Sequence, residues 1–360
     1  MAKSISRTRI ERKSAIAAIG VDLGDRWSHW CVIDHQGNIM QEGRTATERA
    51  ALRAEFGRYQ TTTIAIETGT HSPWVSRELE SLGHRVYVAN SRKLRLIYQN
   101  RRKDDRIDAQ YLARLARLDP QLLAPIRHRS VEVSEHRTLL RSRDVVVAAR
   151  TRLVNHVRGV IKSIGSRLPS CSTETFTTRV REQIPESLRP AIMPLLELLS
   201  SLNTQIRTFD RHIQQIAQRH YPVTARLRQV RGVGPLTALA FVLTIEDPSR
   251  FTSSRTMGPY LGLAPGQDQS GQSSPQKRIS KEGDELLRRL LVGCAQYMLG
   301  PFGTDCDLRR HGLRIAARGG KNGKKRGVVA VARKLAVLLH RLWVSGVQYD
   351  PLYNTRQLAA

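Results

Sequence analysis

The stretch that decides the fold is Lys103–Leu115, which reads K-D-D-R-I-D-A-Q-Y-L-A-R-L. It is rich in helix-forming residues and therefore predicts a helix. Asp105 and Asp108 are three residues apart and Asp104 and Asp108 are four apart, so either pair shares one helix face. Paired carboxylates favour a divalent metal ion, which requires clustered oxygen ligands. The alternative is a solvated first turn, where acids stabilise the helix dipole.

The sequence before this helix predicts a mixed α/β domain. Short apolar runs typical of strands occupy residues 15–24, 27–34, 39–45, 62–67 and 85–89, and helical patterns occupy residues 48–59 and 73–82. The tetrapeptide at 35–38 (H-Q-G-N) is a hairpin signal between the second and third strands. Three strands able to pair antiparallel, followed by alternating helix and strand, are typical of a mixed sheet covered by helices.

Two further acids end predicted strands. Asp22 ends the first strand and Glu67 ends a later one, and catalytic groups gather at strand ends, where loops open the site. A lone acid at such a position is more often a turn or cap residue. Together with Asp105 and Asp108, however, they form four acids from three separated elements. Such a set can hold two Mg²⁺ ions about 4 Å apart for in-line phosphoryl displacement.

The charge of the chain indicates a polyanionic partner. In 360 residues, 59 Lys and Arg oppose 31 Asp and Glu, which gives a net charge of +28. Nucleic acid is the usual partner of so basic a protein. A membrane surface is disfavoured because no apolar run is long enough to span a bilayer and no basic amphipathic anchor is evident. Four cysteines without metal-site spacing, and no secretory signal, predict reduced thiols in a cytoplasmic protein.

The middle of the chain is predicted to hold two long helices. In the first, residues 131–168, a heptad-like apolar seam is interrupted by Arg143 and Arg150. The seam of the second helix steps by four and three residues through Leu195, Leu199, Leu202, Ile206, Phe209, Ile213 and Ile216. Such alternation is the coiled-coil pattern. An intramolecular hairpin and a coil between subunits both satisfy it.

Two segments of the C-terminal part are basic and favour contact with phosphates. Residues 228–240 resemble a helix-hairpin-helix element, in which backbone N–H groups at Arg231, Gly232 and Gly234 would meet a phosphate; a simple helix-start turn is the alternative. Residues 309–341 contain many basic residues and no acid, which favours a nucleic-acid backbone over a solvated helix face. Glycines at 319, 320 and 323 are predicted to break this second segment. Its predicted contacts are Arg318, Lys321, Lys324, Lys325 and Arg326.

Between these segments, a polar loop rich in Gly, Ser and Gln precedes a helix that is predicted to begin near Glu282. Such loops are often only flexible connections. Lys277, Arg278 and Lys281 at its end could hold a phosphate.

Several strings in the sequence resemble a known family. G-V-D-L-G at 20–24, I-E-T-G-T at 66–70 and K-D-D-R-I-D-A at 103–109 are similar to the DEDD-type insertion-sequence transposases, the "insertion-sequence one-ten" family. The family pattern K-T-D-x-x-D-A selects Asp105 and Asp108 and leaves Asp104 as a bystander. Y-L-G-L-A-P at 260–265, S-G at 270–271 and I-S-K-E-G at 279–283 resemble the C-terminal domain of the same family.

The resemblance implies a domain plan. A basic arm at 1–14 precedes a ribonuclease H-like (RuvC-like) α/β domain at 15–128. A coiled-coil helical linker at 129–222 then joins subunits. A mainly α-helical transposase domain with the helix-hairpin-helix-like element occupies 223–348, and a tail occupies 349–360.

The resemblance also implies a chemistry. Asp22, Glu67, Asp105 and Asp108 would bind Mg²⁺, and Ser270 would be the nucleophile that forms a phosphoserine link with DNA. Nearby alternatives are Ser273, Ser274 and Ser280, of which Ser280 belongs to the motif at the start of the next helix. A serine hydroxyl needs a base or a metal for activation, and no histidine lies beside Ser270 in the sequence. The implied partners are donor and target DNA, a bridge RNA, and further subunits in a homodimer or homotetramer. The implied location is the cytoplasm, in association with the nucleoid.

The predicted function is therefore that of a DNA transposase or recombinase. One alternative is a RuvC-like nuclease of the Holliday-junction type, which would use the acids alone. Another is a domesticated protein that only binds nucleic acid. Replacement of Ser270 by alanine separates the first two, because a nuclease that depends only on metal would still cleave.

Overall fold

The computed structural model describes residues 16–93, 104–266 and 277–359. The basic arm, Lys103 and Ser270 lie outside these ranges. The chain divides between His128 and Arg129 into two compact units, each with its own hydrophobic core. Within the described ranges, no helix has the length and apolar character needed to cross a membrane. All four cysteines are free.

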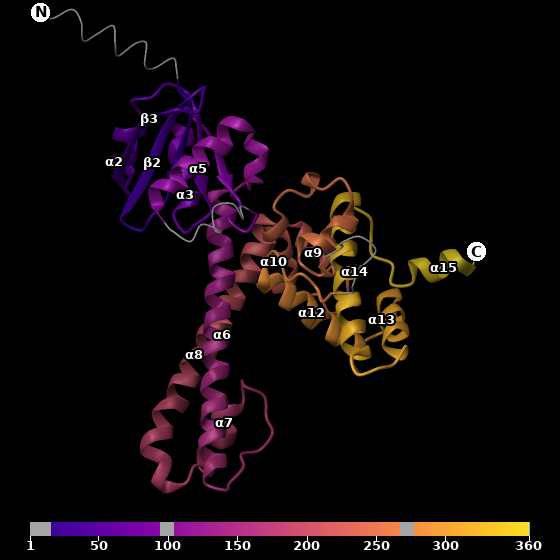
Figure 1. Cartoon of the computed structure of the whole chain (residues 1–360). Coiled ribbons are helices and arrows are strands. Elements are labelled where there is room, and N and C mark those ends of the chain that lie inside the picture. The colour runs from indigo at the N-terminus through magenta and orange to yellow at the C-terminus, as the bar shows by residue number, and fades with distance from the viewer. Residues whose placement is uncertain (1–15, 94–103, 267–276, 360) are drawn as a thin grey trace, which may run out of the picture. The chain divides into compact units, whose positions relative to one another are not determined.

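The N-terminal unit (Figure 1) is built on a five-stranded mixed sheet. The strand order in this sheet is β3-β2-β1-β4-β5. β1 pairs antiparallel with β2 and β2 with β3, whereas β4 is parallel to β1 and β5 is parallel to β4. The strands lie where the sequence predicts them. Their bounds are β1 Ile16–Asp22, β2 Trp27–Asp34, β3 Ile39–Ala46, β4 Thr63–Glu67 and β5 Arg85–Ala89.

Helices cover both faces of this sheet. α2 (Arg49–Phe56) and α3 (Ser72–Ser81) pack on one face, where they enclose a core that includes Ile19 and Val21 of β1. α5 (Asp105–Leu118) packs on the other face, over Ala18. Because successive residues of a strand point to opposite faces, Asp22 at the end of β1 shares the α5 face with Ala18 and Gly20.

Gly20 allows α5 to lie directly on the sheet. A Cβ at this position would stand 2.0 Å from the carbonyl oxygen of Ala109 and 2.4 Å from the amide nitrogen of Ala113. These are backbone atoms, so the helix as a whole would have to move. The separation between β1 and α5 therefore depends on the absence of a side chain at residue 20.

Replacing Gly20 by alanine is expected to lower the free energy of unfolding by about 3 kcal/mol, because the added methyl group overpacks a helix–sheet contact. Urea unfolding measures the change. Gly69→Ala is the control, since a Cβ there meets nothing within 4 Å. Equal unfolding midpoints for the two variants would contradict the close packing at Gly20.

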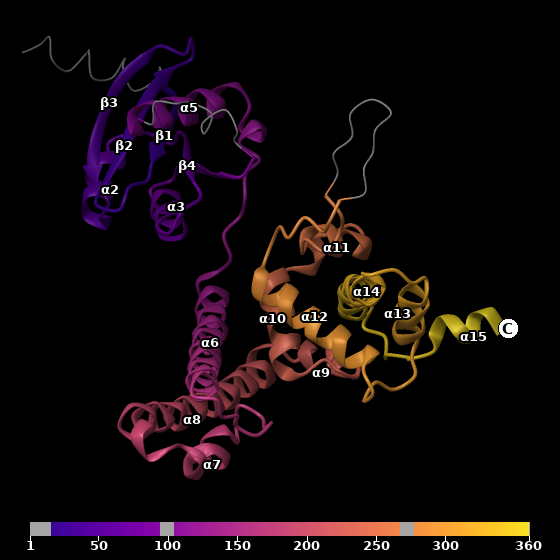
Figure 2. The ribbon, with the colours of Figure 1, turned by 60° about the horizontal axis from the view of Figure 1, so that its bottom comes forward.

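All the regular elements of the C-terminal unit are helices within its described residues (Figure 2). α10 is its central helix, and every residue from Thr237 to Ile245 is buried. α12 and α14 pack around this helix in the same core. The bounds are α9 Val223–Leu227, α10 Pro235–Ile245, α11 Met257–Tyr260, α12 Glu285–Leu299, α13 Asp307–Ala317, α14 Gly323–Ser345 and α15 Tyr353–Ala359.

A long antiparallel hairpin opens this unit. It consists of α6 (Val131–Ser163) and α8 (Arg189–His220), and the short α7 (Phe176–Val180) packs with both at the closed end. The two arginines that interrupt the predicted seam of α6 are paired across the hairpin. Arg143 Nε donates to Asp210 at 2.6 Å, and the buried Arg150 donates to Asn203 Oδ1 at 2.9 Å.

The buried residues of α8 differ in part from the predicted apolar seam. The buried residues of α8 are Ile192, Leu196, Leu199, Asn203, Ile206, Ile213 and Ala217. Of the predicted seam, only Leu199, Ile206 and Ile213 belong to this set, and the other four positions are half-buried. The prediction followed apolar residues alone, whereas the seam also accepts Asn203, which receives the hydrogen bond of Arg150.

Three predicted helix boundaries in this unit are wrong. α6 ends at Ser163 rather than at residue 168, and α12 begins at Glu285 rather than near Glu282. Asp284 caps α12 by accepting a hydrogen bond from the amide of Leu287. Gly323 does not break the basic segment but is the first residue of α14. It packs against α13, since a Cβ there would meet the carbonyl oxygen of Ala316 at 2.8 Å.

Candidate functional site

Asp22 and Glu67 lie side by side at one edge of the sheet. Val21 of β1 is in register with Ile66 of the parallel strand β4, so the residues that follow them occupy equivalent positions at the carboxyl ends of adjacent strands. Both side chains are half-buried, and both belong to the face that α5 covers. This edge of a sheet is where catalytic groups usually gather.

The N-terminus of α5 supplies the other two predicted acids. Asp105 and Asp108 stand in its first turn. Asp105 precedes the buried Ala109 by one helical turn, and Asp108 precedes the buried Leu112 by one turn. Residues four apart share a helix face, so both acids belong to the face that packs on the sheet.

Asp104 has a different role from Asp105. It is the N-cap residue of α5, and its side chain accepts a hydrogen bond from the amide of Arg106 at 3.0 Å. The side chain of Asp105 is half exposed, and its Oδ2 lies 3.7 Å from Nδ1 of His29. Since His29 pairs with Asp22 across β1 and β2, this contact connects the start of α5 with the end of β1.

His29 is the residue at this edge that sequence reasoning missed. His29, Cys31 and Ile33 occupy every second position of β2 and therefore share one face of the sheet. Cys31 and Ile33 are buried on that face, which α5 covers. That alternation was a usable signal, but a lone histidine in a strand carries no metal-site spacing. Asp25, which has no counterpart in the family pattern, lies 3.5 Å from His71 and is 93% exposed.

The acids suit a divalent metal ion by chemistry and by position. Carboxylate oxygens at a half-open sheet edge are the ligands that Mg²⁺ prefers. Within the described ranges, no three of the four acids bring ligand oxygens within 4.8 Å of one another.

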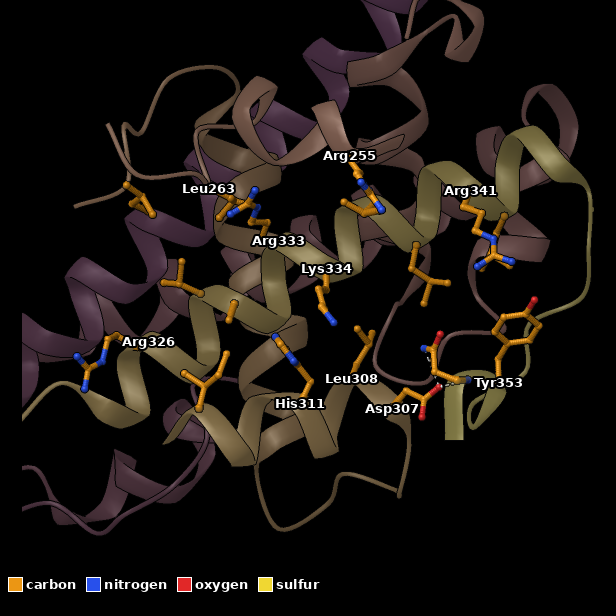
Figure 3. Close-up of a pocket in the computed structure, with 18 of the residues that line it drawn as sticks. Arg255, Leu263, Asp307, Leu308, His311, Arg326, Arg333, Lys334, Arg341 and Tyr353 are labelled. Atoms are coloured by element: carbon orange, nitrogen blue, oxygen red, sulfur yellow. Dashed lines mark hydrogen bonds between the residues drawn. The ribbon is translucent and has the colours of Figure 1, made fainter. Parts of the chain in front are cut away.

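The C-terminal unit contains a second feature, a basic groove of about 1530 Å³ (Figure 3). It lies against α13 and α14 and against the segments on both sides of residues 267–276. Those segments are joined by an antiparallel bridge between Pro265 and Ile279. The groove therefore lies next to the residues that flank segment 267–276, and Ser270 belongs to that segment.

Most of the predicted phosphate contacts line this groove. They are Lys277, Arg278, Lys281, Arg318, Lys325 and Arg326. Lys321 and Lys324 are exposed but are not among its lining residues. The groove also includes Arg255 and His311, which no sequence motif singles out, and Arg333, Lys334 and Arg341 of α14.

His311 is an unusual member of the groove. Its ring and the amine of Lys334 point into the space between α13 and α14 (Figure 3). Burial and the positive charges of Lys334 and its neighbours Arg314 and Arg318 lower the pKa of His311 below its usual value. The imidazole is therefore neutral at pH 7 and available as a hydrogen-bond acceptor or a base.

The predicted helix-hairpin-helix-like element is a glycine turn between α9 and α10. Gly232 adopts a φ of +95°, and a Cβ there would meet the ring of Tyr297 at 2.9 Å, so both conformation and packing require glycine. Gly234 is the N-cap residue of α10. Arg231, which directly precedes Gly232, is exposed. These residues do not line the basic groove.

Two models of known protein families match this chain. Residues 19–165, which include all four acids, match a model of DEDD transposases of the IS110 type, described as "Transposase". Residues 224–302 match a second model, described as "Transposase IS116/IS110/IS902 family". The chain belongs to the IS110 family of transposases. As a transposase it is an enzyme that cuts and rejoins DNA, and its DEDD domain has the ribonuclease H-like fold that the sheet order indicates.

Relatives of this transposase align over most of its length. The "Probable family 20 transposase" of Pseudomonas aeruginosa is 28% identical over 88% of this chain and 93% of its own. The "Transposase for insertion sequence element IS1111A" of Coxiella burnetii is 26% identical over 94% of this chain and 93% of its own. The "Pilin gene-inverting protein" of Moraxella bovis is 24% identical over 89% and 93%.

Proposed function

We propose that this transposase exchanges DNA strands through Ser270, with the target phosphate held in the basic groove. The observation that carries the proposal is that the groove is lined by the residues on both sides of segment 267–276, which contains Ser270. Guanidinium and ammonium groups at this position neutralise a phosphodiester and stabilise the charge that develops when it is attacked.

The proposed step conserves atoms and charge. The Oγ of Ser270 attacks phosphorus, and its proton passes to a base. The bond between phosphorus and one deoxyribose oxygen breaks, and that oxygen takes up a proton. The resulting phosphoserine link retains the energy of the phosphodiester, so attack by the hydroxyl of another strand end reverses the step and joins the new DNA.

Asp22, Glu67, Asp105 and Asp108 are proposed to hold Mg²⁺ at the edge of the ribonuclease H-like sheet. When bound, the metal activates an attacking oxygen and stabilises a leaving one. The residues of the chain position this site: α5 carries two of the acids, and Gly20 fixes its distance from β1. In the family the acids and the serine come from different subunits, and we propose the same division here.

The proposed partners are donor DNA, target DNA and a bridge RNA that pairs with both. The charge of +28 suits several polyanions. The name of the Moraxella bovis relative describes gene inversion, a reaction that cuts and rejoins DNA and so supports strand exchange. The test is to incubate the full chain with Mg²⁺, junction DNA and RNA transcribed from the flanking sequence. A DNA adduct that survives denaturant and maps by mass spectrometry to Ser270 is expected; cleavage without an adduct would contradict the proposal.

The groove is expected to bind DNA through its backbone. Replacing Lys325 and Arg326 by glutamine should reduce the slope of log affinity against log salt by about 2, because each lost phosphate contact removes about 0.9. The loss should be equal for all sequences, since backbone contacts carry no base information. Fluorescence anisotropy at several salt concentrations measures the slope.

The matched control for this experiment has the same change of charge elsewhere. Arg152 and Lys162 are exposed on α6, outside the groove. Their double replacement by glutamine should leave the salt slope near that of the unchanged chain. If both double variants reduce the slope equally, DNA is bound by overall charge and not by the groove.

The apolar residues on the surface of the hairpin lead us to propose that the chain forms a homodimer or homotetramer. In each long helix, half-buried apolar residues repeat every seven positions beside the buried seam. They are Leu139, Val146, Leu153 and Val160 on α6, and Leu195, Leu202, Phe209 and Ile216 on α8. Repeats of this kind suit a second helix pair.

Replacing Leu202 and Phe209 by glutamate is therefore expected to convert the oligomer to a monomer, because the charges could be buried only at high cost. Light scattering coupled to size-exclusion chromatography measures the mass. Gln205 and Gln214 are exposed on the same helix, and their replacement by glutamate should leave the mass unchanged. A monomeric unmodified chain would overturn this proposal.

A further inference from the structure

A group of metal-binding side chains lies in the C-terminal unit, apart from the acids and the basic groove. Glu132 and His136 are four residues apart in the first turns of α6, and His220 is the last residue of α8. One ligand atom from each lies within 4.8 Å of the others. It is the one such group of three among the residues that the structure describes.

The side chains are already oriented by hydrogen bonds. Nδ1 of His136 lies 2.9 Å from the hydroxyl of Tyr221, which leaves Nε2 as its ligand atom. Metal-binding histidines commonly use their second nitrogen in this way, because the partner fixes the ring and its tautomer. Nδ1 of His220 lies 3.0 Å from Oε1 of Glu132, across 88 residues of sequence.

We propose that Glu132, His136 and His220 form a binding site for a divalent transition metal such as Zn²⁺. Two imidazoles and one carboxylate favour zinc, nickel or cobalt over magnesium, which prefers oxygen ligands alone. Tetrahedral zinc with bonds of about 2.0–2.1 Å needs ligand atoms roughly 3.4 Å apart. The ligand atoms lie within 4.8 Å of one another, and Glu132 and His220 are both exposed, so closing to that spacing requires a change only in side-chain rotamers.

The position of the site on the helices is compatible with a cation. The N-terminus of α6 disfavours positive charge, but Glu132 in its first turn offsets that effect. His220 ends α8, where the helix dipole favours a cation. The bound metal would join the start of α6 to the end of α8 and so fasten the open end of the hairpin. Stabilisation of the C-terminal unit is the expected consequence.

The test is Zn²⁺ binding to the full chain, by isothermal titration calorimetry in excess Mg²⁺, with Co²⁺ absorption as a second probe. One bound ion per chain is expected, with a visible cobalt spectrum typical of nitrogen and oxygen ligands. His136→Ala with His220→Ala should abolish binding and the rise in Tm that zinc causes. Tyr221→Phe removes only the partner of His136 and should weaken binding by about 10-fold.

His212, exposed on the same helix α8, provides the control. His212→Ala should bind zinc as the unchanged chain does, and equal loss in both variants would mean nonspecific histidine binding and overturn the site. If the double variant fails to fold, Glu132→Gln at an exposed position is expected to weaken binding at least 10-fold. Asp105→Asn should retain zinc binding, which separates this site from the proposed magnesium site. No saturable zinc binding to the unchanged chain refutes the inference.

Discussion

Replacing Ser270 by alanine is expected to abolish the covalent protein–DNA adduct and to reduce strand exchange by at least about 10³-fold, because the hydroxyl of the proposed nucleophile is removed. DNA affinity should change little, since the basic groove remains. A denaturing gel with labelled junction DNA measures the adduct, and a sequencing assay of rejoined products measures the exchange.

Ser273 and Ser274 provide the controls for this experiment, because they lie in the same loop and carry the same hydroxyl. Alanine at either position should leave the adduct intact. Cleavage that continues unchanged in the Ser270 variant would favour a nuclease that uses the acids alone. Transfer of the adduct to Ser273 or Ser274 would show that the wrong serine was selected.

The second large effect is expected at the start of α5. Asp105→Asn should reduce Mg²⁺-dependent strand exchange by about 10²- to 10³-fold, because it would remove the charge of a proposed metal ligand and keep the shape of the side chain. The titration of activity with Mg²⁺ should also shift to higher concentration. Rates at several Mg²⁺ concentrations separate weaker binding from slower chemistry.

Asp104→Asn is a closely matched control, one residue away in the same helix. Asparagine caps a helix as well as aspartate does, so the hydrogen bond to Arg106 should persist and stability should be unchanged. Activity is expected to remain within about 2-fold of that of the unchanged chain. If Asp104→Asn inactivates as strongly as Asp105→Asn, the family pattern was aligned to the wrong acid.

The N-terminal sheet was largely predictable because its strands are short, apolar and separated by turn signals. β1 and β4 each end in an acid, and that pattern is visible in the sequence. The pairing order was not predictable in the same way. Only the structure gives the register of Val21 with Ile66, from which the neighbouring positions of Asp22 and Glu67 follow.

Contacts between distant segments account for what the sequence did not reveal. The partner of Asp105 is His29, and the N-terminus of α6 meets the C-terminus of α8 through Glu132 and His220. Each pairing depends on tertiary packing, which no local pattern encodes. The seam of α8 was misassigned for the same reason, since Asn203 is buried only because Arg150 faces it.

The hairpin also constrains how its length can evolve. Arg143 faces Asp210, and seven residues further along α6 Arg150 faces Asn203, seven residues back along α8. Deleting the seven residues that follow Arg150, with the closed end of the hairpin kept in place, would move the buried guanidinium by one heptad along α8, from Asn203 to the buried Leu196. Insertions and deletions should therefore be tolerated only when both arms change by the same whole heptad, so relatives with shorter or longer hairpins are expected to differ by paired steps.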